Sequence, residues 1–285
     1  MENIGSLQTT KAILDKYKLS AKISLGQNFL VDLKVIDKII DHVDKSDDCV
    51  IVEVGPGLGA LTEKLLTISK KVIAIEIDKN MVEVMEDNFK DKENFEIIHE
   101  DILKVDLQKL VTDLRKEYKD VYLVANLPYY ITSDILLSVF ALDDPFDQVM
   151  IMVQAEFGQR LVSAHNTKDY RPVTVIAKTF YKCNLSFNVS KNVFLPKPNI
   201  TSAIVKLVRK DTKIEDKADY IKFVQLCFTQ KRKTLFNNLR TEFSNEFTTS
   251  LLESAKIPLN SRPAQLDIND YIRLYGVYDE TKILC

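Results

Sequence analysis

The chain has 285 residues and a formal net charge of −2, and 46% of its residues are hydrophobic and 28% are charged. This composition argues against a disordered protein, and the length suits one large α/β domain with a smaller second domain. Because the molecule as a whole is not a polycation, any binding of nucleic acid must depend on a local basic patch.

Several protein classes are excluded by simple features. Charged residues interrupt the N-terminus, which argues against a secretory signal, and the apolar run at 149–153 is too short to cross a bilayer. The cysteines are scattered without metal-ligand spacing, so we expect no disulfide framework and no metal site; they are Cys49, Cys183, Cys227 and Cys285. We therefore expect a cytoplasmic protein with reduced thiols and no membrane association.

Residues 1–48 are predicted to form a helical and loop extension. Thr9 or Thr10 can cap a first helix. A loop over residues 22–30 follows, and then a second helix with one apolar stripe, formed by Val35, Ile36, Ile39, Ile40 and Val43.

From residue 49 onwards, strand and helix patterns alternate. The predicted strands are 49–54, 71–77, 95–99, 121–125 and 149–153, and the predicted helices are 58–69, 78–89, 133–140 and 155–163. This alternation predicts an α/β fold in which a parallel sheet carries helices on both faces.

The last third of the chain changes character. Two more strand-like runs, 173–179 and 202–208, precede a charged segment at 210–217 that is the predicted linker. We therefore expect a domain over 1–209 and a small all-α domain over 210–285.

The first chemical signal is a glycine-rich turn after the first strand. Gly55, Gly57 and Gly59 follow one another at alternate positions, where glycine lets the backbone approach a ligand closely. The spacing differs from the G-x-G-x-x-G of dinucleotide-binding proteins, and the preceding Glu53 favours a nucleoside without a pyrophosphate. The glycines alone fit a simple strand-to-helix turn equally well.

Two acids follow the next strands. Glu76 lies 21 positions after Gly55, at the end of the second strand, where an acid can hold the hydroxyls of a ribose. Helix capping is the alternative, and it fits Asp78 better. Asp101 follows the third strand and could accept a hydrogen bond from an adenine amino group, although by itself it is an ordinary loop acid.

The most specific signal is the N-x-P-Y motif of Asn126, Leu127, Pro128 and Tyr129 after the fourth strand. The nitrogen of an exocyclic amine is a poor nucleophile because its lone pair is delocalised. The Asn126 oxygen and a main-chain carbonyl beside Pro128, such as that of Leu127, could accept both N–H bonds and localise the lone pair. Tyr129 could stack on the base, which is worth about 1–3 kcal/mol. A plain turn at the strand end is the alternative.

With these motifs in this order, the chain resembles the ribosomal RNA adenine N6,N6-dimethyltransferases, above all the bacterial small-subunit (16S) branch. The resemblance covers nearly the whole chain, through motifs at 24–30, 53–62, 126–133, 152–156, 194–198, 202–203 and 230–239. It implies a Rossmann-like class I S-adenosylmethionine methyltransferase fold. Two segments depart from the family pattern: Ala155 replaces a common lysine, and residues 170–174 lack a usual glycine, which could alter a turn near the substrate.

The resemblance also implies roles for individual residues. The residues expected to contact S-adenosylmethionine are Asn28, Leu30, Gly55, Glu76, Asp101 and Asn126. Phe194 is expected to pack on one face of the target base, and the alternative is an aromatic tucked into the core. The reaction is direct transfer of a methyl group to adenine N6, for which positioning is the chief requirement. No base is required, and His42, His99 and His165 lie outside the motifs.

The expected partner is small-subunit rRNA within the immature 30S particle, methylated by a monomer at two adjacent adenosines near the 3′ end. The predicted RNA-binding residues form a run without acids: Lys231, Arg232, Lys233 and Arg240. A solvated helix face is the alternative, and Lys206, Arg209 and Lys210 could extend the patch. Three other functions stay open: a large-subunit (23S) dimethylase conferring macrolide resistance, a non-catalytic assembly factor, and a DNA adenine methyltransferase.

Overall fold

The computed structural model describes residues 3–22 and 25–283, so Ser24 and Cys285 lie outside the described residues. The chain forms two compact units. The first comprises Met1–Val139, Asp144–Gly158 and Asn184–Arg209, and the second comprises Phe140–Asp143, Gln159–Cys183 and Lys210–Cys285. The second unit thus combines the C-terminal segment with a segment that precedes residue 184.

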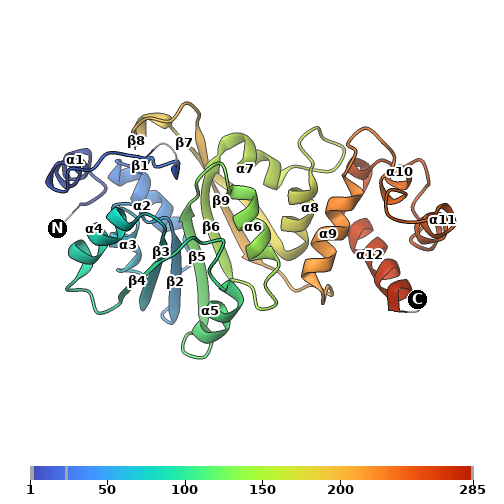
Figure 1. The fold of residues 1–285 in the computed structure, drawn as a ribbon, viewed down its shortest axis with the longest axis horizontal. Helices are drawn as coiled ribbons and strands as arrows, with labels where there is room; N and C mark the ends of the chain where they lie inside the picture. Colours follow the sequence, from blue (N-terminus) through green and yellow to red (C-terminus); the bar gives the residue numbers. More distant parts are fainter. Residues whose placement is uncertain (1–2, 23–24, 284–285) are drawn as a thin grey trace. The chain divides into compact units, whose positions relative to one another are not determined.

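A seven-stranded sheet with the order β4-β3-β2-β5-β6-β9-β7 is the centre of the first unit (Figure 1). Its strands are β2 (Cys49–Val54), β3 (Lys71–Glu76), β4 (Phe95–His99), β5 (Asp120–Asn126), β6 (Gln148–Gln154), β7 (Tyr181–Val189) and β9 (Ser202–Arg209). The strands from β4 to β6 pair in parallel, but β9 pairs with β6 in the antiparallel sense. The sheet is therefore mixed, not wholly parallel as the sequence suggested.

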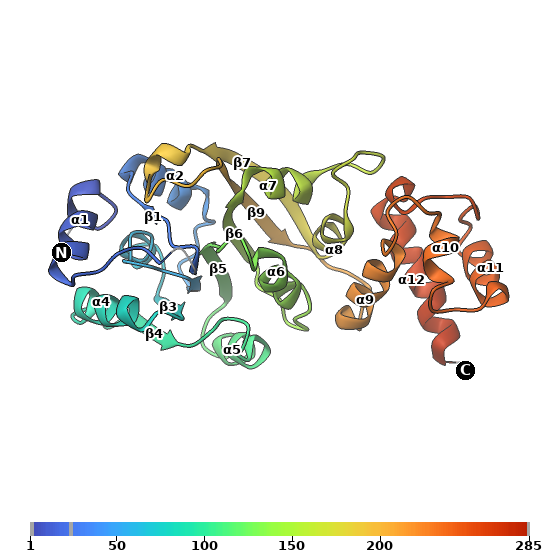
Figure 2. The ribbon, with the colours of Figure 1, turned by 45° about the horizontal axis from the view of Figure 1, so that its top comes forward.

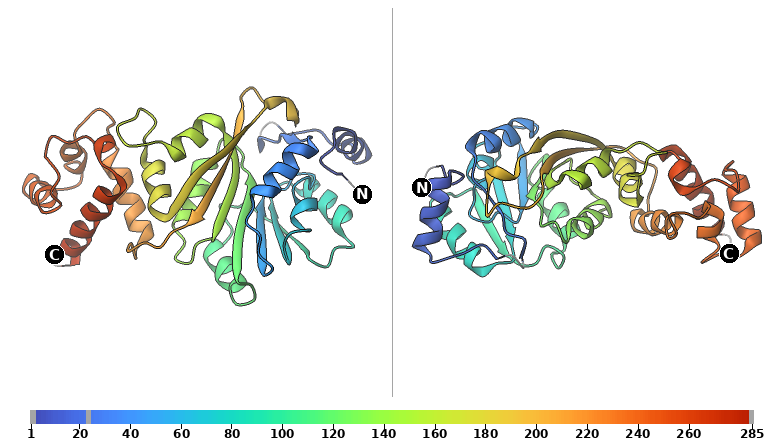
Figure 3. Two further views of the ribbon diagram at one scale, coloured as in Figure 1. Left: turned by 180° about the vertical axis from the view of Figure 1, so that it is seen from behind. Right: turned by 90° about the horizontal axis from the view of Figure 1, so that it is seen from above.

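The middle strands are buried on both faces, which explains their continuous apolar sequences. All six residues of β2 are buried. On one face, α2 (Leu33–His42) packs its Ile36 and Ile39 into a core cluster that contains Ile51 of β2. Helices α5 (Leu107–Leu114) and α6 (Thr132–Phe140) lie on the opposite face (Figures 2 and 3).

Two further helices of this region, α1 and α4, begin after residues whose side chains accept hydrogen bonds from the first turn. Helix α1 (Leu7–Lys16) is capped by Ser6, whose Oγ accepts from the Thr9 amide at 3.1 Å. The expectation of a cap at Thr9 or Thr10 is therefore wrong. The predicted helix 58–69 shortens to α3 (Thr62–Leu65), whereas α4 (Lys79–Phe89) starts after its cap Asp78 and α7 spans Ala155–Val162. Helix α5 was not predicted.

The segment 173–179, predicted as a strand, is a helix, α8 (Pro172–Phe180). Proline at the first helical position fits that end of a helix, and the Thr174 hydroxyl accepts from the Arg171 amide at 3.1 Å. Its β-branched residues other than Val173 are buried, and Thr179 bonds to the Tyr220 hydroxyl at 2.8 Å. Packing therefore overrides the strand propensity of this run.

The C-terminal segment is helical as predicted. Its elements are α9 (Lys217–Cys227), α10 (Leu235–Leu239), α11 (Asn245–Ser254), a 3₁₀ turn at Pro263–Gln265, and α12 (Ile268–Ile283). Aromatic side chains pack α9 against α12, with the rings of Tyr220 and Tyr275 5.1 Å apart and nearly perpendicular. Edge-to-face packing of this kind is favourable between aromatic rings.

A short antiparallel pair connects two distant loops. Strand β1 (Phe29–Leu30) pairs with β8 (Phe194–Leu195), which follows a 3₁₀ turn at Lys191–Val193. Leu30 lies opposite Phe194, and both side chains are buried in the core cluster beneath α2. This pairing fixes the N-terminal loop beside the carboxyl ends of the sheet strands.

Over the described ranges, no helix is long and apolar enough to span a bilayer. Within the same ranges, no group of three or more His, Cys, Asp or Glu side chains could hold a metal ion. The described cysteines Cys49, Cys183 and Cys227 are free thiols.

Candidate active site

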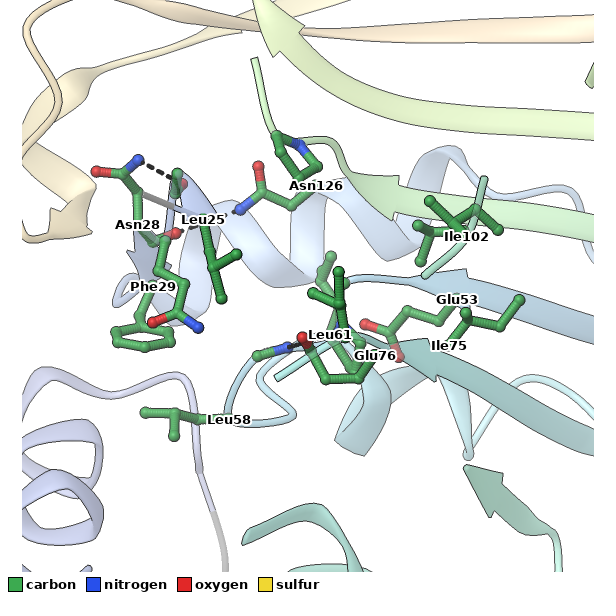
Figure 4. Close-up of a pocket in the computed structure, with 18 of the residues that line it drawn as sticks. Leu25, Asn28, Phe29, Glu53, Leu58, Leu61, Ile75, Glu76, Ile102 and Asn126 are labelled. Atoms are coloured by element: carbon green, nitrogen blue, oxygen red, sulfur yellow. Dashed lines mark hydrogen bonds between the residues drawn. The ribbon is translucent and has the colours of Figure 1, made fainter. Parts of the chain in front are cut away.

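A pocket lies where β2, β3 and β5 end, in the first unit (Figure 4). Parallel strands bring the residues that follow them to one edge of a sheet, the usual ligand site of such folds. The empty space in the pocket, including the part open to solvent, is about 1180 Å³. Among its lining residues are Asn28, Leu30, Glu53, Gly55, Gly57, Glu76, Asp101, Asn126, Pro128 and Tyr130.

The glycine turn forms the floor of this pocket. Gly55, Gly57 and Gly59 all have positive φ angles, of 67°, 59° and 95°, a backbone region that side chains disfavour. The Gly55 amide donates to the Ile75 carbonyl at 3.0 Å, which ties the turn to β3. A Cβ atom at Gly59 would lie only 2.5 Å from Phe89 Cε2. Gly59 therefore allows close packing of the turn on α4, and Gly55 and Gly57 present backbone to the pocket.

Two buried carboxyl groups stand in the pocket wall. Glu53 is 1% exposed and its Oε2 accepts from the Thr62 hydroxyl at 2.5 Å. Burial, with a contribution from the negative charge of Glu76, raises the pKa of Glu53 to about 8. Glu76 is 6% exposed, and burial raises its pKa as well. Hydroxyl donors or a cationic group on a ligand would stabilise the charged form of both acids.

Glu76 and Asp78 have different tasks. Glu76 accepts from the Asp78 amide at 2.8 Å and from the Gly57 amide at 3.4 Å, so its carboxylate is held at the pocket by backbone donors. The Asp78 side chain instead caps α4 by accepting from the Asn80 amide at 3.1 Å. Asp101 also lines the pocket, and its Oδ1 accepts from the Leu103 amide at 3.0 Å.

Asn126 is the last residue of β5 and meets the N-terminal loop across the pocket (Figure 4). Its Nδ2 donates to the Asn28 carbonyl at 3.3 Å, and the Asn28 Nδ2 donates to the Gly26 carbonyl at 2.9 Å. The contact to Asn28 fixes the amide plane of Asn126 and leaves the Asn126 side-chain oxygen as an acceptor.

The other residues of the N-x-P-Y motif divide between the pocket and the core. Pro128 lines the pocket, but Leu127 and Tyr129 do not belong to its lining. The Leu127 side chain is buried and its amide donates to the Met152 carbonyl at 3.1 Å. The Tyr129 hydroxyl bonds to Ser202 Oγ at 2.7 Å, and burial raises the pKa of that hydroxyl.

Phe194 does not lie on the pocket surface. It is 4% exposed and belongs to the core cluster beneath α2, where it faces Leu30. In this arrangement its ring is not available to cover a base. The position matches the alternative stated for Phe194 from the sequence, an aromatic side chain packed in the core. Sequence reasoning also missed Tyr130, which lines the pocket and is 60% exposed. Its position directly after the N-x-P-Y motif is the feature of the sequence that could have indicated a place in the pocket.

The segments that depart from the family pattern lie elsewhere. Residues 170–174 lead into α8 and form its first turn in the second unit, and neither they nor Ala155 line the pocket. The histidines are also absent from its lining. His42 Nδ1 lies 2.8 Å from the Lys38 carbonyl, and His99 Nε2 lies 3.3 Å from the Ile77 carbonyl.

The predicted RNA-binding residues are all exposed in the second unit. Lys231, Arg232 and Lys233 occupy the turn between α9 and α10, and Arg240 follows α10 with its guanidinium carbon 5.6 Å from the centre of the Phe236 ring. The residues that could extend the patch have intramolecular partners: Lys206 pairs with Asp44, Arg209 with Asp144, and Lys210 bonds to the Lys178 carbonyl.

Comparison with known proteins gives full-length matches. The family model of the ribosomal RNA adenine dimethylases matches residues 18–280. Ribosomal RNA small subunit methyltransferase A of Levilactobacillus brevis is 39% identical over 98% of this chain and 97% of the relative. The protein of the same name from Staphylococcus haemolyticus is 38% identical over 96% and 95%.

Solved structures agree with these matches. A dimethyladenosine transferase from Plasmodium falciparum superposes with a TM-score of 0.74 at 26% identity, over 89% of this chain and 98% of the other. The 23S rRNA methyltransferase ErmE, at 23% identity and a TM-score of 0.63 over 88% and 100%, shares the fold. The fold is that of the class I S-adenosylmethionine methyltransferases. The chain belongs to the ribosomal RNA adenine dimethylase family.

Proposed function

We propose that this chain transfers methyl groups from S-adenosylmethionine to the N6 amino groups of two adjacent adenosines near the 3′ end of small-subunit (16S) rRNA, within the immature subunit. The observation that carries the proposal is Asn126, held at the pocket by the Asn28 carbonyl, opposite a wall with the glycine turn and Glu76. The relatives named as small subunit methyltransferases, similar over almost the entire chain, support this choice of rRNA.

The pocket fits S-adenosylmethionine in three respects. Gly55 offers open backbone for the methionine part, Glu76 offers a carboxylate to the ribose hydroxyls, and Asp101 offers an acceptor to the adenine amino group. Asn28 and Leu30 would complete the site from the N-terminal loop. The cofactor is a cation, and its positive charge would favour the ionised forms of the buried acids Glu53 and Glu76, whose pKa values are raised by burial.

When bound, the cofactor supplies a methyl group on a positively charged sulfur. The task of the chain is to orient the amine towards it. The Asn126 oxygen and the Leu127 carbonyl would accept the two N6–H bonds and localise the nitrogen lone pair. Leu127 and Tyr129 are anchored by Met152 and Ser202, which would hold the motif rigid during this step. Stacking of Tyr129 or Phe194 on the target base would require their rings to leave these positions.

RNA would be held by phosphate contacts in the second unit. Lys231, Arg232, Lys233 and Arg240 are exposed cations without acids in their sequence run. Contacts of this kind weaken steeply with salt because counterions are released on binding. We therefore propose residues 210–285 as the main rRNA-binding region.

Methyl transfer from radiolabelled S-adenosylmethionine tests the proposal. The acceptors are under-methylated small subunits, naked large-subunit rRNA and duplex DNA, with nucleoside analysis of the product. N6,N6-dimethyladenosine on the small subunit alone is the expected result. Transfer to large-subunit rRNA would support a resistance dimethylase, and transfer to DNA a DNA adenine methyltransferase. Cofactor binding with no transfer to any acceptor would refute the catalytic proposal in favour of an assembly factor.

A further inference from the structure

Tyr130 is an exposed aromatic side chain at the mouth of the pocket. It is 60% exposed, and it lines the same pocket as Asn126 and Pro128. Within the described part of the chain its hydroxyl has no hydrogen bond, so neither burial nor a polar contact explains its position. An exposed aromatic ring at the mouth of a pocket is a surface on which a base can stack.

The ring lies close to the turn at Gly26. A Cβ atom on Gly26 would lie 3.6 Å from Tyr130 Cε1 and 3.7 Å from Pro128 Cβ, which are ordinary contact distances, so the space between this turn and the ring holds no more than a methyl group. That turn has a positive φ of 66° at Gly26 and is held by the hydrogen bond from Asn28 Nδ2. A ring beside a fixed turn has less room to move, so it loses less conformational freedom when a base stacks on its open face.

The two aromatic residues that sequence motifs assign to the target base are engaged elsewhere. Tyr129 bonds to Ser202 through its hydroxyl and does not line the pocket, and Phe194 is buried in the core. Tyr130 is thus the aromatic residue in the pocket lining whose ring is most open to an incoming base.

We propose that Tyr130 stacks on the unpaired base next to the target adenine and so holds the RNA strand in register at the pocket mouth. This inference rests on the proposed function. The target adenine must leave the helical stack to reach Asn126, and its neighbour then remains outside the pocket without a stacking partner. Because the proposed substrate has two adjacent adenosines, this neighbour is a purine, which offers a large surface to an aromatic ring.

Fluorescence of a base analogue tests the contact directly. An rRNA 3′-terminal fragment is prepared with 2-aminopurine in place of one of the two adenosines. The analogue has no amino group at position 6, so the remaining adenosine is the only target and the register is fixed. On saturating binding, the wild type and Tyr130→Phe should quench the analogue, and Tyr130→Ala should leave it several-fold brighter. Equal fluorescence with the wild type and Tyr130→Ala, in both placements, would overturn the proposal.

Kinetics distinguish an RNA contact from a cofactor contact. Tyr130→Ala should raise the KM for RNA about tenfold, or about 1.4 kcal/mol, the size of a modest stacking contact, and Tyr130→Phe should restore it. The Kd for S-adenosylmethionine should stay unchanged. Leu7→Ala, which removes an exposed apolar side chain outside the pocket, is the matched control and should change neither value. A loss of cofactor affinity that accounts for the whole effect would overturn the proposal.

The two proposals fail in different ways. If the wild type methylates large-subunit rRNA and not the small subunit, the proposed substrate is wrong, and the stacking test is then read on that RNA. If small-subunit methylation is normal and removing the base of the neighbouring adenosine, to leave an abasic site, does not change the wild-type KM, the inference about Tyr130 alone is wrong.

Discussion

Replacing Asn238 with alanine should loosen the turn that presents the basic residues of the second unit. Asn238 is fully buried in α10. Its Oδ1 accepts from the Gln230 amide at 2.6 Å, and its Nδ2 donates to the carbonyls of Gln230 at 3.3 Å and Thr234 at 3.1 Å. One side chain therefore ties both ends of the turn 230–234, in which Lys231, Arg232 and Lys233 lie.

The size of the effect follows from these contacts. Each buried hydrogen bond contributes a net of about 0.5–1.5 kcal/mol, so losing three should lower the free energy of unfolding by about 2–4 kcal/mol. The loss of RNA affinity caused by Asn238→Ala should not exceed the loss in the triple variant in which Lys231, Arg232 and Lys233 become alanine. That triple variant should lower the slope of log affinity against log salt by about 2, at roughly 0.7 per single-strand phosphate contact. Asn238→Ala should lower the slope by part of this amount.

Salt titrations of rRNA binding with the wild type, Asn238→Ala, the triple variant and their combination measure this coupling. Asn238→Ala should weaken binding in the wild-type background and have no further effect in the triple variant, while cofactor affinity stays unchanged throughout. Thr248→Val is the matched control, since it removes a buried hydroxyl that donates to the Ser244 carbonyl at 2.8 Å in the same unit. Reduced stability with an unchanged salt slope in Asn238→Ala would refute the reasoning, as would an equal loss of affinity in both backgrounds.

Asn126→Ala should abolish methyl transfer without changing the thermal unfolding midpoint, and wild-type turnover in that variant would contradict the assigned chemistry. Gly59→Ala should lower the free energy of unfolding by about 2–5 kcal/mol, because Gly59 has a positive φ and an added Cβ would collide with Phe89. Gly276→Ala in α12 has open space around the added Cβ and should raise the free energy of unfolding by about 0.5–1 kcal/mol. Urea titrations measure both effects. Glu53 has a folded pKa of about 8 against an ordinary value of 4.5, so the folded state binds more protons between these values and the wild type should lose stability as pH rises. Glu53→Gln should remove that loss, and parallel stability profiles for variant and wild type would show that Glu53 titrates normally.

Strand prediction succeeded where burial dominates the sequence. The runs 49–54 and 149–153 lie in β2 and β6, whose residues are almost all buried, because short apolar segments between turns favour buried strands. The same rule failed at 173–179, whose β-branched residues form α8. There the deciding factors are Pro172 at the helix start and the contacts of Thr174 and Thr179, which connect residues up to 41 positions apart. Contacts between residues so far apart cannot be detected in the local hydrophobic periodicity of the sequence.

Sequence reasoning likewise succeeded for some features of the candidate site and failed for others. It could be predicted that Gly55, Glu76, Asp101 and Asn126 share a pocket, because each ends or follows one of the parallel strands of the sheet, and topology brings these strand ends together. The orientation of aromatic side chains could not be predicted. Whether the Tyr129 ring faces the pocket depends on its partner Ser202, 73 positions away, and a motif specifies the residue type without specifying that partner.

The N-terminal loop makes the two halves of the site depend on each other. On one side, Lys22 Nζ and Gln27 Nε2 bond to the buried Asp78 carboxylate at 2.7 and 2.8 Å, and the Asp78 amide holds the Glu76 carboxylate at the pocket. On the other side, the Asn28 carbonyl holds the Asn126 amide. The acid proposed for the ribose and the amide proposed for the base are thus positioned by residues only a few positions apart in the chain. A substitution that displaces this loop should therefore impair cofactor binding and base positioning together, whereas a substitution in either sheet strand alone should impair only one.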